Sequence, residues 1–162
     1  MKKWFFIVLG AAITFSACSK KKDDCSTTAP TTVASSSETA YLQNYLTANS
    51  ITATQINGMF YSFTSAGSGE SPNLCNTISV IYTGKLITGT TDGAVFDSSN
   101  GAAVSLSMSN LIAGWQLVLP LVKTGGVVTL YIPPSLGYGA SASGPIPGNS
   151  YLKFNVQLNS VQ

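Results

Sequence analysis

The segment "TLYIPPSLGYGA", residues 129–140, runs from an apolar strand into a loop built of prolines, glycines and a tyrosine. Pro133 and Pro134 stiffen the start of this loop, because a proline ring fixes its own φ angle. Tyr138 follows between Gly137 and Gly139, and the segment contains no histidine, cysteine, lysine or carboxylate. Chemistry at such a loop therefore has to rest on shape, on the backbone and on hydroxyl groups such as that of Tyr138.

Around this segment the sequence alternates apolar and polar residues with a period of two, which is typical of strands with one buried face. The alternating stretches are residues 59–64, 77–86, 104–108 and 152–158. One further helix is predicted over residues 111–122, "LIAGWQLVLPLV", with Pro120 in its early turns, and it is apolar enough to be buried against a sheet. The pattern predicts an α+β domain in which a twisted antiparallel sheet curls around one short helix.

Residues 35–50 have the pattern of an amphipathic helix that precedes the sheet. Ser35, followed three residues later by Glu38, makes a capping box, which satisfies free backbone N–H groups at a helix start. Apolar side chains then recur at helical spacing; they are Tyr41, Leu42, Tyr45 and Leu46. We expect this stripe to dock either on the domain or on a second copy of the chain.

The first residues have the pattern of a signal peptide, with two lysines ahead of the apolar residues 4–15. As a helix this run spans about 18 Å, short of the ~30 Å of a bilayer core. The string "FSAC" at 15–18 resembles a lipobox, which implies removal of residues 1–17 and lipid attachment at Cys18. The alternative is ordinary secretion with Cys18 lost or free.

Residues 18–34 are rich in serine, threonine and proline and are predicted to form a flexible tether. The string "SKKKDD" resembles the charged tether that sends some lipoproteins of Gram-negative bacteria to the cell surface. We therefore expect a membrane-anchored lipoprotein outside the cytoplasm, at the outer membrane, on its periplasmic or its cell-surface face.

Two further cysteines, Cys25 and Cys75, make an even pair once Cys18 carries lipid. Disulfides persist outside the cytoplasm, so a bridge between them is one alternative, worth about 4 kcal/mol for a loop of this length. Two unpaired thiols are the other alternative.

Charge and composition exclude several classes of function. From residue 26 onward the chain has three lysines and four acidic residues, a net charge of about −1, and it contains no arginine or histidine. Nucleic acid is therefore not expected as a partner, because phosphate binding needs a clustered basic face. Histidine-based triads and metal sites are excluded, and the glycine pair at 125–126 lacks the context of a nucleotide-binding loop. We expect no cofactor and no metal.

Six short motifs occur in a fixed order along the second half of the chain. They are "YTGKL" at 82–86, "VFDSS" at 95–99, "LIAGW" at 111–115, "KTGG" at 123–126, "IPPSLGYG" at 132–139 and "IP" at 146–147 followed by "LKFNVQL" at 152–158. Their order and spacing resemble the FKBP-type peptidyl-prolyl cis-trans isomerases over residues 59–162. The resemblance implies an isomerase domain over residues 51–162, whose fold agrees with the α+β pattern.

The implied activity explains why the loop at 129–140 needs no nucleophile. The bond before a proline isomerises slowly, because its partial double-bond character sets a barrier of about 20 kcal/mol. Twisting the amide makes it less charge-separated, so an apolar pocket favours the twisted state. A thousandfold acceleration needs only about 4 kcal/mol, which shape, desolvation and one or two hydrogen bonds supply.

The resemblance also implies a role for each site residue. Asp97 is expected to act electrostatically on the twisting amide, and the Tyr138 hydroxyl and the Ile112 N–H to bind the substrate backbone. Trp115 is expected to form the pocket floor. The expected walls and rim are Tyr82, Phe96, Phe154, Leu111, Ile112 and Ile146. Proline-containing polypeptides are the implied clients, and macrolides are implied inhibitors.

The sequence departs from the family pattern at three places. The hairpin between Tyr82 and Phe96 is longer by about four residues, which suits an exposed tip. No basic residue follows Asp97 where the family often pairs its aspartate. Val104 and Leu106 are aliphatic where an aromatic side chain often lines the pocket, which predicts a roomier site.

Two other functions compete with the isomerase. A binding module would hold proline-containing peptides in the same groove without turnover, a reading that the aliphatic residues favour. A structural surface lipoprotein would bind neither peptides nor macrolides.

Overall fold

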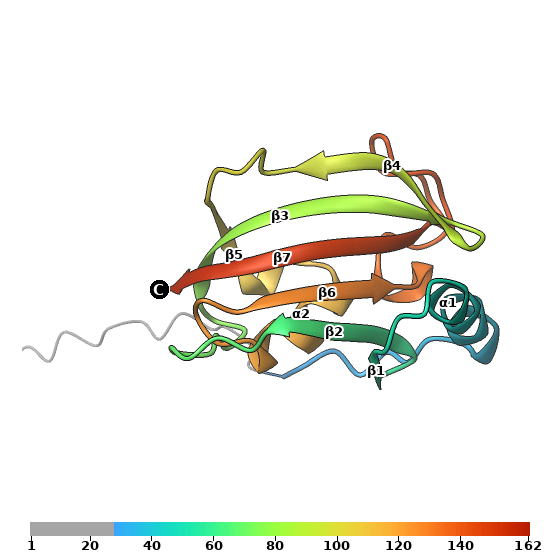
Figure 1. Ribbon diagram of the computed structural model, residues 1–162. Coiled ribbons are helices and arrows are strands. Elements are labelled where there is room, and N and C mark those ends of the chain that lie inside the picture. Colours follow the sequence, from blue (N-terminus) through green and yellow to red (C-terminus); the bar gives the residue numbers. More distant parts are fainter. Residues whose placement is uncertain (1–27) are drawn as a thin grey trace, which may run out of the picture.

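The computed structural model describes residues 28–162 of the 162-residue chain. Two α-helices and one set of antiparallel strands make up this part of the chain (Figure 1). The helices are α1 (Ser36–Ala48) and α2 (Ala113–Val118). The strands are β1 (Thr54–Ile56), β2 (Met59–Ser65), β3 (Thr77–Thr88), β4 (Thr91–Ser98), β5 (Val104–Ser107), β6 (Val127–Ile132) and β7 (Tyr151–Val161). Single 3-10 turns lie at Met108–Asn110, Leu119–Leu121 and Pro134–Leu136.

All strands join one sheet in the order β1-β2-β6-β7-β3-β4, and every pairing is antiparallel. The long strand β3 pairs with β7 on one side. On its other side it pairs with β5 through residues 77–80 and with β4 through residues 83–88. The α+β fold class with a twisted antiparallel sheet is therefore confirmed.

The main core lies between the sheet and α2. Helix α2 buries Trp115, Leu117 and Val118, and β7 turns every second side chain toward them. The buried side chains of β7 are Leu152, Phe154, Val156 and Leu158. Because side chains alternate across a strand, one face of β7 belongs to this core and holds α2 in place.

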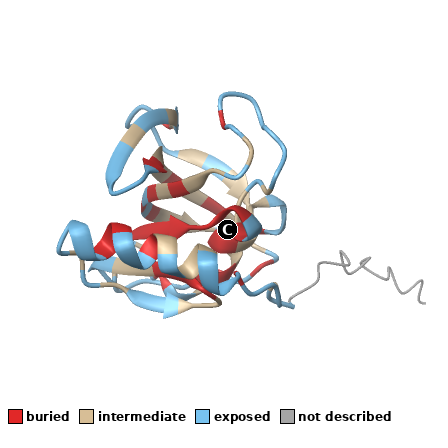
Figure 2. Cartoon of the chain, turned by 90° about the vertical axis from the view of Figure 1, so that its right-hand side faces the viewer, coloured by how far each residue is buried: buried red, intermediate tan, exposed pale blue. Residues whose placement is uncertain are grey.

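Helix α1 packs on the opposite face of the sheet, near the C-terminal end of β6 (Figure 1). The capping box is present: the Ser35 hydroxyl accepts from the Glu38 N–H, and the Glu38 carboxylate accepts from the Ser35 N–H. The helix buries one side and exposes the other (Figure 2). The cluster beneath it consists of Leu42, Tyr45, Leu46, Phe60, Ile87 and Tyr131. Of the two expected alternatives, the apolar stripe therefore docks on the domain.

Strand β2 differs from the predicted one-sided strand, because its start is covered on both faces. Met59 belongs to the main core, whereas Phe60 belongs to the cluster under α1. Toward the end of the strand Phe63 is exposed. The two-sided burial follows from α1, which covers only one end of the sheet.

The sequence prediction needs three corrections. Helix α2 ends at Val118, well before residue 122, and Pro120 lies in the 3-10 turn that follows it instead of in early helical turns. The end of the predicted tether is docked: Ala34 is buried and its N–H donates to the Asn57 carbonyl at 2.9 Å. Strands β1 and β4 have too little alternation to be recognised; in β4 most residues are exposed.

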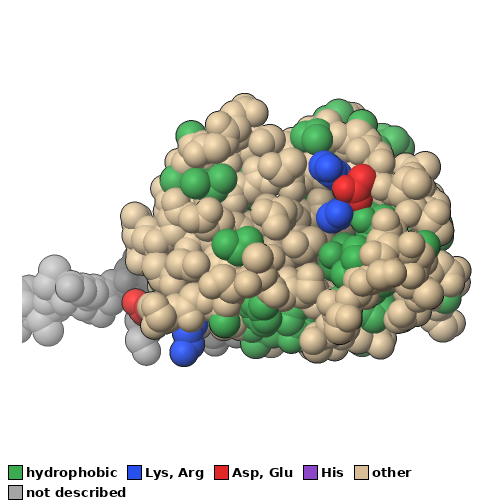
Figure 3. All heavy atoms as spheres, in the orientation of Figure 1, with side chains coloured by type: hydrophobic (Ala, Val, Ile, Leu, Met, Phe, Trp, Pro, Cys, Tyr) green, Lys and Arg blue, Asp and Glu red, His purple; other side chains and the backbone are tan. Residues whose placement is uncertain are grey.

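The described surface carries few charges. Figure 3 shows two basic side chains around an acidic one on this face, and another basic and another acidic side chain near its lower left edge. Lys85 and Lys153 both form ion pairs with Asp92, at 3.2 and 3.1 Å. None of the helices in residues 28–162 is both long and apolar enough to cross a membrane.

Candidate active site

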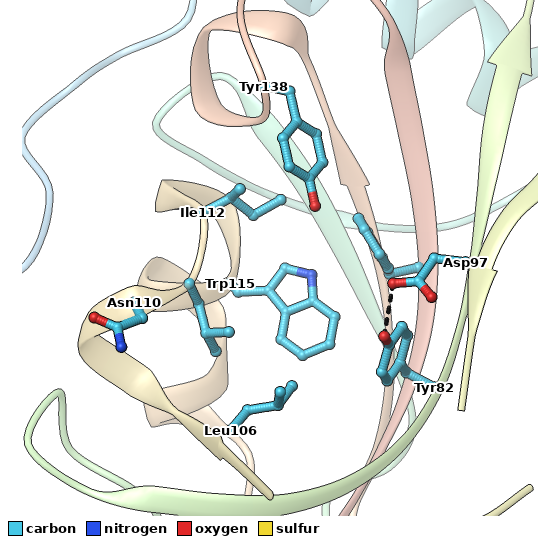
Figure 4. Close-up of a pocket in the computed structure, with 9 residues that line it drawn as sticks. Tyr82, Asp97, Leu106, Asn110, Ile112, Trp115 and Tyr138 are labelled. Carbon is cyan, nitrogen blue, oxygen red and sulfur yellow. Dashed lines mark hydrogen bonds between the residues drawn. The ribbon is translucent and has the colours of Figure 1, made fainter. Parts of the chain in front are cut away.

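A hollow of about 230 Å³ opens between α2, the sheet and the loop that follows β6 (Figure 4). Strand β3 supplies Tyr82, strand β4 supplies Asp97, and the loop supplies Tyr138. The full lining is Tyr82, Asp97, Leu106, Asn110, Leu111, Ile112, Trp115, Tyr138 and Phe154. The structure thus brings together residues that lie up to about 70 positions apart in the sequence, because β3, β4, β7 and α2 meet at one edge of the core.

Aromatic rings make the floor and one wall of this hollow. Trp115 is only 4% exposed, and its ring contacts Tyr82 and Phe154 edge-on, with centroids 5.5 and 5.2 Å apart. Edge-to-face contacts at these distances stabilise aromatic clusters beyond the burial of their area. The rings are therefore held as a rigid apolar surface, and they leave a cavity above Trp115.

Gly84 on β3 makes room for these rings. A Cβ atom on Gly84 would lie 2.7 Å from Phe96 and 2.8 Å from Phe154, closer than real Cβ contacts come. Phe96 and Phe154 pack edge-on across this glycine, with centroids 5.4 Å apart. The packing of these two rings therefore requires glycine at position 84, the third residue of the "YTG" motif. The motif marked this position, but the sequence did not show the reason.

Asp97 is fixed at the rim by two donors. The Tyr82 hydroxyl donates to its Oδ2 at 2.6 Å, drawn as the dashed line in Figure 4, and the Ser98 N–H donates to its Oδ1 at 2.8 Å. Burial, and next the hydrogen bond to Asp97, raise the pKa of Tyr82 to about 12. In residues 28–162 no cation forms an ion pair with Asp97, whose side-chain hydrogen bonds come from the Tyr82 hydroxyl and the Ser98 N–H.

Tyr138 points its hydroxyl into the hollow from the opposite side (Figure 4). The side chain is 39% exposed, and no residue of the described chain hydrogen-bonds its hydroxyl. Partial burial, and next the charge of Asp97, raise the pKa of Tyr138. The hydroxyl therefore stays protonated at neutral pH and is free to donate to a ligand.

Two N–H groups at the hollow are also without a partner in the described residues. Ile112 immediately precedes α2, and its backbone N–H lies outside the helical hydrogen-bond ladder. The Trp115 Nε1 atom is buried without an acceptor. Because buried polar groups are nearly always hydrogen-bonded, unpaired donors at an apolar hollow are typical of a ligand site.

Phe96 and Ile146 do not line this hollow. Together with Asp97 and Tyr138 they line an adjoining depression of about 310 Å³ that continues across the Ser143–Pro145 loop. Because Asp97 and Tyr138 line both depressions, a ligand that extends past these two side chains would occupy both. The roles assigned to Phe96 and Ile146 stay predictions, and their place is in the second depression.

Asn110 lines the hollow and the Ser143–Pro145 loop lines the second depression, although neither was predicted from the sequence. Asn110 directly precedes the "LIAGW" motif, and its position next to this motif could have indicated that it lines the site. The loop carries only small residues, which give no chemical signal. Leu106 lines the hollow as an aliphatic side chain, whereas Val104 does not line it.

Part of the predicted chemistry lies outside the described residues. Cys75 is disulfide-bonded, but Cys18 and Cys25 precede residue 28, so the pairing with Cys25 and the lipidation of Cys18 stay predictions. Within residues 28–162 no three cysteine, aspartate or glutamate side chains come together in a way that could hold a metal ion.

Comparison with known proteins agrees with this geometry. The family model described as FKBP-type peptidyl-prolyl cis-trans isomerase matches residues 69–159. The peptidyl-prolyl cis-trans isomerase Mip of Coxiella burnetii is 40% identical over 124 residues, which cover 73% of this chain and 52% of that protein. FkpA of Escherichia coli is 40% identical over 111 residues, covering 67% of this chain and 40% of the relative. The chain thus spans about half the length of these relatives or less.

Solved structures place the fold in the same group. The crystal structure of FkpA from Escherichia coli superimposes with a TM-score of 0.63 at 32% identity, over 77% of this chain and 62% of that one. A peptidyl-prolyl cis-trans isomerase from Pseudomonas syringae pv. tomato shares the fold with a TM-score of 0.66 at 23% identity, over 82% and 99% of the two chains. The chain belongs to the FKBP-type peptidyl-prolyl cis-trans isomerase family.

Proposed function

We propose that this chain is a peptidyl-prolyl cis-trans isomerase that acts on proline-containing polypeptides outside the cytoplasm. The observation that carries the proposal is the apolar hollow above Trp115, with unpaired donors of Tyr138 and Ile112 at its rim. Membership of the family supports the same activity.

The hollow suits the twisted state of an amide. A proline ring that packs on the Trp115 indole, beside Tyr82 and Phe154, would be shielded from water. The planar amide is more charge-separated than the twisted one and loses more solvation on entering the hollow, so the barrier falls. The apolar surface and the volume of about 230 Å³ fit one such ring and its neighbours.

The polar groups hold the substrate backbone while the bond turns. The Ile112 N–H donates to one substrate carbonyl, and the Tyr138 hydroxyl donates to another. Asp97 is held by Tyr82 and Ser98, so its carboxylate faces the carbonyl carbon of the twisted amide without reorganising. It transfers no proton, and no covalent bond forms.

Relaxation of a proline-containing peptide tests this function. Wild type is expected to accelerate the relaxation, and Asp97→Ala to lose most of the acceleration, whereas Lys123→Ala, an exposed lysine away from the hollow, serves as the control. A binding module would bind the peptide but leave the rate at background in all three proteins. A structural lipoprotein would bind neither peptide nor macrolide.

Macrolide binding belongs to the same proposal. Leu106 lines the hollow where the family often has an aromatic side chain, so a macrolide would find fewer ring contacts and bind weakly. Competition between a macrolide and the peptide in the relaxation assay measures this.

We also propose that Cys18 is lipidated and anchors the chain at the outer membrane, with the tether predicted over residues 18–34 ending where Ala34 docks on the domain. Sequence alone supports this part. Labelling with a fatty-acid analogue in wild type and in Cys18→Ser, followed by membrane fractionation, tests it. A thiol count on the mature protein tests the bridge between Cys25 and Cys75.

A further inference from the structure

We propose that Glu38 of α1 is a positioning residue for Tyr138, and that α1 thereby takes part in the isomerase site although it packs on the other face of the sheet. The inference rests on the function proposed above. Nothing in α1 reaches the hollow itself, so Glu38 acts through the loop that carries Tyr138.

The contact joins residues 97 positions apart. The Oε1 atom of Glu38 accepts the backbone N–H of Ser135 at 2.9 Å, and its Oε2 atom accepts the Ser135 hydroxyl at 3.0 Å. Ser135 lies in the 3-10 turn Pro134–Leu136, three residues before Tyr138. Hydrogen bonds to a carboxylate are shorter and stronger than neutral ones, so the turn has a firm tie to the helix.

The carboxylate is itself held by the start of the helix. Its Oε2 atom also accepts the N–H and the hydroxyl of Ser35, both at 2.9 Å. Partial burial opposes ionisation of Glu38, but the hydrogen bonds from Ser35 and Ser135 outweigh it and lower its pKa. Since Leu42 and Leu46 bury α1 against the sheet, Glu38 is an anchor with little freedom to move.

The turn transmits this tie to Tyr138. The N–H groups of Gly137 and Gly139, on either side of Tyr138, both donate to the Pro134 carbonyl, at 3.0 and 2.9 Å. Residues 134–139 are thus bound into one unit. Pro134 and Leu136 are buried and fix its inner side, and the Gly139 carbonyl accepts the Asn149 N–H at 2.9 Å. Exposed Ser135 is held by Glu38. We expect loss of this contact to let the Ser135 end of the unit shift, which moves the Tyr138 hydroxyl away from its position over the hollow.

A double-mutant cycle on the full chain tests this. Glu38→Ala is expected to lower kcat/KM for a proline peptide about three- to tenfold, the worth of one hydrogen bond from Tyr138. Tyr138→Phe is expected to do the same, and the double variant to be no slower than Tyr138→Phe. Effects that multiply in the double variant would overturn the proposal, because Glu38 would then act independently of Tyr138.

Tyr41→Phe is the matched control on the same helix. The Tyr41 hydroxyl accepts the Gly89 N–H at 2.6 Å and so ties α1 to the β3–β4 turn, away from the Tyr138 loop. The variant is expected to lower Tm and leave kcat/KM unchanged. A loss of activity as large as that of Glu38→Ala would mean that α1 merely stabilises the fold, and the proposal would be wrong.

A spectroscopic measurement separates this inference from the proposed function. The NMR signals of the Tyr138 ring and of the Ser135 amide are expected to shift in Glu38→Ala and to stay in place in Tyr41→Phe. If wild type has no isomerase activity but these shifts occur, the positioning stands and the proposed function fails; unshifted Tyr138 signals overturn the positioning. Glu38→Gln, which keeps an acceptor for the Ser135 N–H, is expected to be intermediate and replaces Glu38→Ala should that variant not fold.

Discussion

The two faces of the sheet carry aromatic clusters that pair their polar atoms differently. Under α1, the Tyr45 hydroxyl donates to Asp92 at 2.5 Å and accepts from Lys153 at 3.2 Å, while the Tyr41 hydroxyl accepts from Gly89. At the hollow, the Tyr138 hydroxyl and the Trp115 Nε1 have no protein partner in residues 28–162. Because an unpaired buried polar group costs stability, the first arrangement is typical of a structural face and the second of a face that binds a ligand.

Ring packing follows the same division. Tyr41 stacks on Tyr151 with ring centroids 3.9 Å apart, and neither residue lines the hollow. Around the hollow three ring pairs meet edge-on and the pair Tyr82–Phe154 is tilted, and the cavity opens above Trp115. Substitutions in the buried cluster under α1 should therefore change stability alone, whereas substitutions around the hollow should change binding as well; Glu38, which reaches the Tyr138 loop, is the exception on α1.

The largest stability effect is expected on the α1 face. Leu42 is fully buried there, so Leu42→Ala should lower the free energy of unfolding by about 2–5 kcal/mol. Chemical denaturation measures it. A loss below about 1 kcal/mol would mean that α1 is only loosely attached. The cluster under α1 would then not be a structural part of the domain, and the comparison of the two faces would fail.

On the pocket face, Gly84→Ala should displace the Phe96 and Phe154 rings. The expected cost is about 1–3 kcal/mol, together with weaker binding of a proline peptide, measured by calorimetry. Thr83→Ala, whose side chain lies on the outer face of β3, is the control and should leave peptide affinity unchanged. Unchanged affinity in Gly84→Ala would show that the ring positions do not define the hollow.

Acid should weaken the α1 face through its carboxylates. Burial opposes ionisation of Asp92, but hydrogen bonds from Tyr45, Lys153 and Lys85 outweigh it and lower its pKa below the ordinary 3.8; the pKa of Glu38 is also lowered. Groups with a depressed folded pKa stabilise the fold above their unfolded pKa, and this stability is lost as pH falls through the folded pKa.

The unfolding free energy should therefore fall between about pH 5 and pH 2. In Asp92→Asn the fall should be shallower, although stability at neutral pH should be lower because two lysines lose their partner. Denaturation curves across this range measure both. An equally steep fall in Asp92→Asn would exclude Asp92 as a source of the pH dependence.

The smallest effects are expected from the lysines that bind Asp92. The Lys85 side chain is 39% exposed and that of Lys153 is 25% exposed, and Lys153 also donates to Tyr45. Lys85→Met should change stability by only about 0.2–1 kcal/mol, as exposed ion pairs do, and Lys153→Met should cost more. Equal effects would mean that the Tyr45 contact adds nothing.

Much of the fold could be read from local patterns. The capping box at Ser35 and Glu38 began α1 where the structure has it, and the period-two stretches marked β2, β3, β5 and β7. Strand β4 was not predicted, because it lies at an edge of the sheet and most of its residues are exposed. Its sequence therefore does not alternate between apolar and polar residues. Helix α2 was predicted too long because an apolar run does not reveal where packing stops a helix.

For the site, the sequence by itself determined the kinds of side chain: aromatic rings, one carboxylate and one loop tyrosine in fixed order, with no histidine or arginine for other chemistries. The tertiary structure alone decided which of them share a hollow, that Phe96 and Ile146 lie in the second depression, and that Glu38 reaches Ser135. The physical reason is that residue type and periodicity are local properties of the chain, whereas contacts across 97 positions exist only after strands and helices have packed.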